Sequence, residues 1–269
     1  MTFEERYDSI GRLDRLSYGD TFIHRLDPRT KVVVTGLFLL TVVSFDKYAV
    51  TPLAPFFLFP VLLLTLGEIP AWFILRKVLF VSPFALVIGI FNPVLDTRTV
   101  GVIAGLPLAA GWLSFVSILL KFVLTVSAAL LLVATTSFPG VCHALRRLGL
   151  PAPFVSQFLF LYRYLFTLLE EAMRIVRARD LRSFGARGAG MRSFTRLVGV
   201  LFLRTVARAE RIYCAMLARG FHGDIPTLRR CRAGAGDWAF LAAAFAYLAL
   251  FRLFPVTEGI GRLAEGWLG

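Results

Sequence analysis

The chain has 269 residues, of which 57% are hydrophobic, and its formal net charge is +13 at pH 7. A soluble globular domain contains about 45–50% apolar residues, whereas the mean hydropathy of this chain reaches +0.72 and its apolar residues gather in long runs. This composition excludes an ordinary soluble domain and predicts an all-α integral membrane protein. A strongly basic chain can also bind nucleic acid. Here the basic residues flank or separate apolar runs, as cytoplasmic loops do, so we expect no nucleic-acid partner.

Apolar runs predict about five transmembrane helices, at residues 32–45, 48–66, 72–94, 112–135 and 237–254. Before the first run, Asp27 and Pro28 form a good helix start, because the Asp side chain accepts from a free backbone N–H and Pro suits the first helical position. We expect Arg29 and Lys31 to hold that end at the membrane surface, and His24 to be a surface or interface residue.

Individual runs have features of their own. Three prolines in the second run predict a kinked helix: Pro52, Pro55 and Pro60. Residues 96–111 are predicted to form a polar, glycine-bearing loop. Lys121 is the one charge well inside a span, and such a charge is a functional hypothesis by default. Because no acidic residue stands inside any other span, the sequence favours a lysine that reaches the interface or pairs with a backbone carbonyl.

The basic residues are distributed unevenly along the chain. Of the 30 Lys and Arg residues, 17 lie between Phe138 and Gly236 and 6 precede Val32. The positive-inside rule therefore places the N-terminus and the long basic stretch in the cytoplasm. The predicted parts are a cytoplasmic N-terminal segment (1–31), four transmembrane helices (32–136), a cytoplasmic region (137–236), and a last transmembrane helix with its tail (237–269). We expect no cleavable signal peptide, because the first 31 residues contain no apolar core.

The stretch 151–226 predicts two long amphipathic helices separated by a glycine-rich break at 185–190. On the first helix, apolar residues recur at steps of 4, 3, 4 and 3 and predict a stripe on one face: Phe154, Phe158, Leu161, Leu165 and Leu168. We call the first four of them the apolar stripe. On the second, the same spacing produces a basic stripe: Arg204, Arg208 and Arg211.

Both amphipathic helices are predicted to end in an Ala-Arg pair, Ala178-Arg179 in the first and Ala218-Arg219 in the second. An Arg at a helix tip presents a planar fork to carboxylates or carbonyls of another protein, in contacts that Lys cannot match. Gly220 permits the left-handed turn that stops a helix. The alternative is that these Arg-rich helices contact anionic lipid headgroups. The two similar ends and the apolar stripe favour a protein partner.

No catalytic or metal site stands out in the sequence. Cys142 and His143 are adjacent, but a soft-metal site needs three or four ligands and the next His is distant. The chain has three cysteines, Cys142, Cys214 and Cys231, and their positions show no repeated spacing. We expect all three to be free thiols. No nucleophile–base pair or phosphate-binding glycine loop is visible. We therefore predict that this chain is not an enzyme and holds no metal or other cofactor.

Three motifs follow one another between about residues 15 and 225. The first is His-Arg-Leu-Asp-Pro-Arg-Thr-Lys at 24–31; the second is Tyr-Arg-Tyr-Leu-Phe at 162–166 with Glu170-Glu171 and Arg177-Ala178-Arg179; the third is Ala-Met-Leu-Ala-Arg-Gly-Phe at 215–221. In this order they resemble the N-terminal signature and the two coupling helices of the transmembrane T component of energy-coupling-factor (ECF) transporters. The residues of both long motifs are most similar to those of the cobalt-type members, the CbiQ group, and slightly less similar to those of the nickel-type members.

The resemblance implies a non-catalytic scaffold in a prokaryotic cell membrane, part of an ATP-driven importer for cobalt ions. It would link two cytoplasmic ABC ATPases, which bind the ATP and Mg, to a separate substrate-binding membrane subunit. The resemblance further implies that the coupling helices cross, and that the ATPases receive their tips: Ala178, Arg179, Ala218, Arg219 and Gly220. The apolar stripe would face the substrate subunit. Asp180 departs from the family pattern, which makes Arg219 a stronger candidate than Arg179.

The sequence leaves some other functions open and disfavours others. A nickel- or vitamin-type T subunit and a stand-alone secondary transporter remain alternatives. Secondary transporters often carry internal repeats, and none is visible here. An ordinary ABC permease would need a Glu-Ala-Ala loop with a following Gly, but Met173 stands where the second Ala would be.

Overall fold

The structure, a computed structural model, describes residues 16–95, 99–103, 106–182, 191–223 and 234–253. The predicted glycine-rich break at 185–190, Cys231 and the first 15 residues lie outside these ranges. The chain divides into two compact units, one made of Met1–Tyr7 and Leu145–Arg230 and the other of Asp8–Ala144 and Cys231–Gly269. Almost all the described residues are helical, which confirms the all-α fold class.

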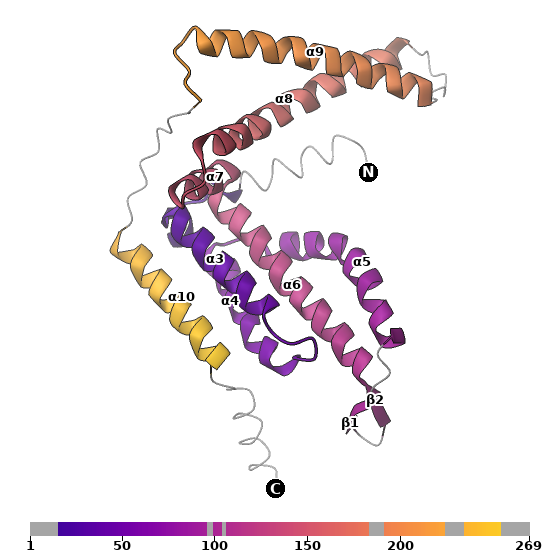
Figure 1. Cartoon of the computed structure of the whole chain (residues 1–269), viewed down its shortest axis with the longest axis vertical. Coiled ribbons are helices and arrows are strands. Elements are labelled where there is room, and N and C mark those ends of the chain that lie inside the picture. The colour runs from indigo at the N-terminus through magenta and orange to yellow at the C-terminus, as the bar shows by residue number, and fades with distance from the viewer. Residues whose placement is uncertain (1–15, 96–98, 104–105, 183–190, 224–233, 254–269) are drawn as a thin grey trace. The chain divides into compact units, whose positions relative to one another are not determined.

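The elements are easily followed in Figure 1. The larger unit contains α2 (Phe22–Arg25), α3 (Pro28–Val43), the 3-10 helix η1 (Thr51–Phe57), α4 (Leu58–Leu66), α5 (Ala71–Leu95), β1 (Thr99–Ile103), β2 (Leu106–Ala109), α6 (Ala110–Thr136) and α10 (Ala235–Leu253). The helix α7 (Phe138–Arg147) leads into the smaller unit, which contains α8 (Ala152–Arg182) and α9 (Met191–Leu217). The segment predicted to be a polar loop includes the antiparallel hairpin β1–β2, in which Ile103 pairs with Leu106.

Four helices are long and apolar enough to cross a membrane: Ala71–Pro93 of α5, Gly111–Thr136 of α6, α8 and α10. Three of them match predicted spans, whereas α8 belongs to the region predicted to be cytoplasmic. The first two predicted spans correspond to α3 and to η1 with α4, and each is shorter than the roughly 20 residues that span a bilayer. The second is broken between 3-10 and α geometry, as its prolines predicted. The chain is thus a multi-pass membrane protein.

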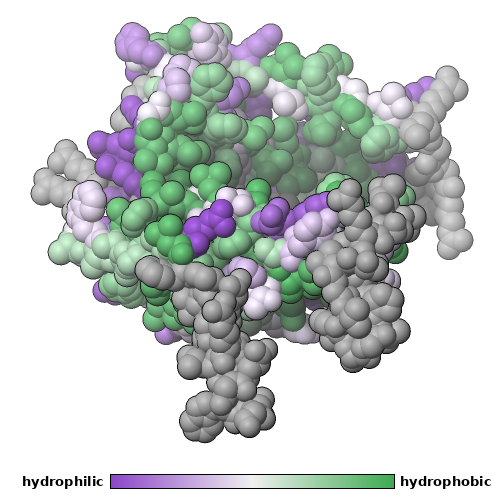
Figure 2. All heavy atoms as spheres, turned by 60° about the horizontal axis from the view of Figure 1, so that its bottom comes forward, coloured by the Kyte–Doolittle hydropathy of each residue, from purple (hydrophilic) through white to green (hydrophobic). Residues whose placement is uncertain are grey.

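Large apolar side chains lie on the outside of these helices. On α5, Trp72, Leu79, Phe80 and Phe84 are each 68–72% exposed, and hydrophobic residues cover much of the surface seen in Figure 2. A soluble protein rarely exposes so large an apolar area, whereas lipid tails cover it at no cost. Figure 1 also shows that α5 bends along its length; Pro83 inside it removes a backbone donor.

An aromatic core joins α3, η1, α4 and α10. Phe38 is fully buried and stacks on Phe59 with ring centroids 4.3 Å apart. Phe56, also fully buried, meets Tyr247 of α10 edge-on at 6.1 Å. The Tyr247 hydroxyl donates to the carbonyl of Pro55 at 2.8 Å. Aromatic pairs of this kind contribute about 0.5–1.5 kcal/mol beyond the area they bury, so this core holds the short helices together.

Two lysines join α3 and α6 through hydrogen bonds to backbone carbonyl groups. Lys31, near the start of α3, is buried and donates to the carbonyls of Thr135 at 2.9 Å and His24 at 3.4 Å. Lys121 of α6 donates to the carbonyls of Phe45 at 2.5 Å and Asp46 at 3.2 Å, just beyond the end of α3. The last carbonyls of a helix lack intrahelical donors and carry partial negative charge. Lys31 therefore stabilises the C-terminal end of α6, whereas Lys121 holds the turn that follows α3.

The predictions for Lys121 and Lys31 can be compared with these contacts. Lys121 pairs with backbone carbonyls, which is the interpretation that the sequence favoured. That Lys31 holds its helix end at the membrane surface stays a prediction, but the side chain itself is only 4% exposed and reaches back into the helix junction. A lysine at a helix start next to an apolar run looks the same in sequence whether it faces water or a neighbouring helix end.

A carboxylate ties α10 to the start of α3. Asp27 is the N-cap of α3 and accepts from the N–H of Arg29 at 2.9 Å, as predicted. Its own N–H donates to Asp237 Oδ1 at 2.6 Å, and the N–H of Gly234 donates to Asp237 Oδ2 at 2.7 Å. The buried Asp237 thus caps its own helix and orients the beginning of α3.

His24 is buried, against the prediction that it lies at a surface or interface. Its Nε2 donates to the carbonyl of Leu16 at 2.9 Å, and the hydroxyl of Thr21 is 2.6 Å from its Nδ1. Burial is the main cause that lowers the pKa of His24 below its ordinary value. The ring is therefore neutral at pH 7, with Nε2 as the donor and Nδ1 as the acceptor.

Replacing Lys31 by Met should lower the free energy of unfolding by about 2–3 kcal/mol, because a buried carbonyl loses a charged donor. Lys121→Met is the matched control and should cost about 1 kcal/mol or less, since Lys121 is partly exposed and water can reach its carbonyl partners. Thermal unfolding in detergent, followed by far-UV circular dichroism, measures both. Equal losses in the two variants would contradict the assignment of Lys31 as the buried contact.

Candidate functional site: the α8–α9 helix pair

The smaller unit is built on two long helices that cross, as predicted for residues 151–226 (Figure 1). The helix α8 has 31 residues and α9 has 27, which correspond to about 45 and 40 Å. An ion pair joins them, with the guanidinium of Arg204 2.9 Å from the carboxylate of Glu171. Beyond α9 the chain returns to the start of α8, where the hydroxyl of Ser156 donates to the carbonyl of Gly223 at 3.1 Å. The segment after α9 is thus hydrogen-bonded to the start of α8.

The end of α9 is fixed by a Schellman motif. The N–H of Phe221 donates to the carbonyl of Met216 at 3.1 Å, and the N–H of Gly220 donates to that of Leu217 at 3.0 Å. Gly220 has a φ of 79°, a left-handed conformation that glycine adopts without strain. The ring of Phe221 then packs 6.2 Å from that of Phe160 on α8. The Ala-Arg-Gly-Phe sequence therefore specifies a rigid helix end.

Arg219 lies at this end as the C-cap residue. Its side chain and Ala218 are exposed. Among the residues that the structure describes, no hydrogen bond or ion pair holds the guanidinium of Arg219. The small Ala218 beside it leaves room for a close approach. An unpaired planar cation on a rigid helix end can bind a carboxylate or a row of backbone carbonyls.

The end of α8 differs from the prediction. The helix continues past Ala178-Arg179 to Arg182, so Arg179 lies within its last turn and not at a helix end. The guanidinium of Arg179 is paired with its neighbour, because Nε and one terminal nitrogen lie 2.9 and 2.6 Å from Asp180 Oδ1. Arg179 is therefore already bound to a carboxylate of the same chain.

The apolar stripe of α8 is exposed. Phe154 is 60% exposed, Phe158 41%, Leu161 63% and Leu165 42%. The four side chains lie on one face by helical spacing. The stripe is thus an apolar surface that nothing in the smaller unit covers among the described residues.

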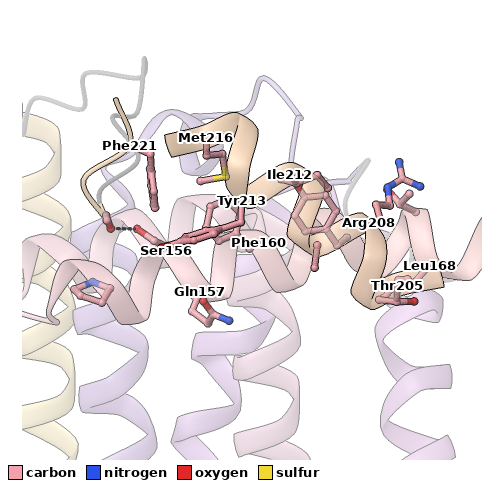
Figure 3. A pocket seen from close by; sticks show the side chains of 15 residues that line it. Ser156, Gln157, Phe160, Leu168, Thr205, Arg208, Ile212, Tyr213, Met216 and Phe221 are labelled. Carbon is pink, nitrogen blue, oxygen red and sulfur yellow. Dashed lines mark hydrogen bonds between the residues drawn. The ribbon is translucent and has the colours of Figure 1, made fainter. Parts of the chain in front are cut away.

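Sequence reasoning missed an apolar groove between α8 and α9, with a volume of about 440 Å3. From α8 it is lined by residues that include Phe160, Tyr164 and Leu168, of which Leu168 also continues the spacing of the apolar stripe. From α9 it is lined by residues that include Arg208, Ile212 and Met216. Figure 3 shows Phe221 and Met216 at one end and Arg208 with Thr205 at the other. The spacing of these residues is helical, but their pairing across two helices depends on the crossing.

The described ranges contain no group of three His, Cys, Asp or Glu side chains that could hold a metal ion. Cys142 is buried, and this burial raises the pKa of its thiol to about 11. The thiolate, which is the form that binds metals, is therefore scarce at neutral pH. The absence of a metal site from the whole chain stays a prediction.

Comparisons with known proteins agree with these features. The model of the family described as "Cobalt transport protein", CbiQ, matches residues 19–229. The energy-coupling factor transporter transmembrane protein EcfT of Streptococcus thermophilus is 29% identical over 231 residues, which cover 79% of this chain and 85% of that protein. An uncharacterized protein of Methanocaldococcus jannaschii is 29% identical over 262 residues, covering 94% and 86%.

A further relative matches over a shorter part of the chain. The cobalt transport protein CbiQ of Salmonella typhimurium is 35% identical over 99 residues, which cover 36% of this chain and 44% of that protein. The family match extends over well more than half of the chain and includes both Ala-Arg pairs. The chain therefore belongs to the cobalt transport protein (CbiQ) family, the cobalt-type T components of ECF transporters.

Proposed function

We propose that this T subunit couples ATP hydrolysis by two partner ABC ATPases to the movement of a separate substrate-binding membrane subunit, and that the cargo is cobalt. The observation that carries the proposal is Arg219, which lies exposed on a rigid helix end and has no ion-pair partner within the described residues. The names of two relatives, an energy-coupling factor transporter protein and a cobalt transport protein, support the transport role. The chain itself hydrolyses nothing and holds no cofactor, since ATP and Mg are bound by the ATPases.

Arg219 is the principal contact to one ATPase. Its backbone position is set by the Schellman motif around Gly220, so little conformational entropy is lost when a partner binds it. No internal carboxylate within the described residues competes for its guanidinium. A groove on the ATPase that offers carboxylates or carbonyls can therefore bind it in a bidentate manner.

Arg179 is the weaker contact, to the second ATPase. Its guanidinium must leave Asp180 before it can bind the ATPase. The loss of this ion pair offsets part of the free energy of binding. An exposed ion pair is worth about 0–1 kcal/mol, so Asp180 weakens the contact without abolishing it.

The helix α8 transmits movement from the ATPases to the substrate subunit. It is continuous over 31 residues, and Arg179 follows Leu165 of the apolar stripe by 14 residues, just under four turns. The stripe and Arg179 therefore lie near one face of a single rigid helix. A displacement at Arg179 moves the stripe, against which the substrate subunit packs.

The protein lies in a prokaryotic cell membrane with its N-terminus and the α8–α9 pair in the cytoplasm. The excess of Lys and Arg in these segments supports this orientation. The cargo is bound by the substrate subunit. Uptake of labelled Co2+ but not Ni2+ by cells that express the whole complex is the expected result, and a preference for Ni2+ would overturn the choice of cargo.

Replacing Arg219 by Ala should raise the rate at which the ATPases dissociate by at least tenfold, because a desolvated Arg in a partner groove is worth about 2–5 kcal/mol. Arg179→Ala should have a smaller effect in the same direction, and the double variant a larger one than either. Asp180→Ala should slow dissociation about two- to fivefold, since it releases Arg179. Biolayer interferometry with the chain in nanodiscs and purified ATPases measures these rates.

Arg196→Ala is the matched control for charge, because Arg196 is another exposed arginine of α9. It should leave dissociation unchanged. If Arg196→Ala and Arg219→Ala weaken the association equally, the ATPases respond to overall positive charge and Arg219 is not the coupling residue.

Replacing Leu161 by Asp should abolish cobalt uptake while ATPase association is retained, because the charge interrupts the apolar stripe but lies far along α8 from Arg179. Leu203→Asp is the control: Leu203 is 69% exposed on α9, close to the 63% of Leu161. It should leave uptake near the wild-type level. Co-purification of the substrate subunit, read in the same membranes, should be lost only with Leu161→Asp; retention there would rule out the stripe as its docking surface.

A further inference from the structure

The α8–α9 groove has two chemically different ends. Its middle and one end are apolar: Figure 3 shows Phe160 on α8 near Ile212 and Met216 on α9, with Phe221 at that end, and Tyr164 is a further lining residue. The other end carries the guanidinium of Arg208. A volume of about 440 Å3, mostly apolar walls and one charged group are typical of a site for a small amphiphilic molecule.

Arg208 is the cation available at this groove. One turn away, Arg204 is neutralised by Glu171 at 2.9 Å. Arg208 is exposed, and among the residues that the structure describes no carboxylate pairs with it. Together α8 and α9 carry ten arginines against four acidic residues, so the surroundings of the groove also attract an anion.

We propose that the α8–α9 groove binds an anionic phospholipid, with one acyl chain between Phe160 and Met216 and the phosphate on Arg208. The inference depends on the chain being a membrane protein, not on how the ATPases are coupled. A phospholipid supplies both parts that the groove requires, an apolar chain and an anion at its end. Free phosphate would satisfy Arg208 but leave the apolar walls in contact with water.

An apolar helix of a partner protein is the competing occupant. It would cover Phe160, Tyr164 and Ile212, but it would leave Arg208 without a counterion at the edge of an apolar contact, which is unfavourable. Charge complementarity therefore favours the lipid. A bound lipid would also fill the space between α8 and α9 and hold the crossing helices at a set distance.

Native mass spectrometry of the purified chain in detergent tests the proposal, with added dioleoyl phosphatidylglycerol or dioleoyl phosphatidylcholine. The anionic lipid should bind more tightly to the wild type. Arg208→Gln should weaken its binding about tenfold, equivalent to about 1.4 kcal/mol, and reduce the preference over phosphatidylcholine. Arg208→Lys should retain most of the preference. Ala209→Phe, which places a ring in the groove, should weaken binding of both lipids.

Arg196→Gln is the matched control, since it removes an exposed charge of α9 that does not line the groove. It should leave lipid binding unchanged, and dihexanoyl phosphatidylglycerol should bind far more weakly than the dioleoyl lipid. Equal losses in Arg196→Gln and Arg208→Gln would show diffuse attraction and overturn the proposal. So would displacement of the lipid by millimolar inorganic phosphate. If the complex with the substrate subunit no longer binds lipid through Arg208, the groove belongs to a partner helix and the proposal is wrong.

Discussion

The structure of the larger unit depends on how helix ends are satisfied where water is scarce. The last carbonyls of a helix have no intrahelical donor, and leaving them unpaired in an apolar medium is costly. Lys31 meets this need at the end of α6, and Lys121 donates to the carbonyls of Phe45 and Asp46 in the turn after α3. Asp237 does the same for backbone N–H groups at the start of α10 and α3. These few charged contacts position the short helix α3 against α6 and α10.

In the smaller unit, the important difference is between arginine side chains that stay exposed and those that pair with a carboxylate of the same chain. The Glu171–Arg204 pair and the packing of Phe221 on Phe160 hold α8 against α9. The Schellman turn at Gly220 then leaves Arg219 exposed, whereas Arg179 is paired with Asp180. Two motifs that look alike in sequence are therefore unequal, and the proposed coupling is asymmetric. The groove between α8 and α9, with Arg208 at one end, is the proposed binding site for an anionic phospholipid.

Much of the candidate site could be predicted from the sequence because it is local. The stripe from Phe154 to Leu165 follows from the helical period alone, and its exposure agrees with a surface kept for a partner. The helix end at Gly220 follows from glycine's tolerance of positive φ. The continuation of α8 beyond Arg179 could not be predicted, because Asp-Leu-Arg neither stops nor demands a helix. The groove needs the crossing of two helices, which no local pattern encodes.

By itself the sequence determined the membrane class, most helix positions and the Asp27-Pro28 helix start, since apolar runs and capping residues act over one or two turns. Only the tertiary structure decided the roles of Lys31, His24 and Asp237. Lys31 bonds a carbonyl 104 residues away, and Asp237 accepts from an N–H 210 residues away. Their partners are backbone groups, which every residue carries. No side-chain pattern marks such a partner, so these buried contacts become visible only when the helices are packed.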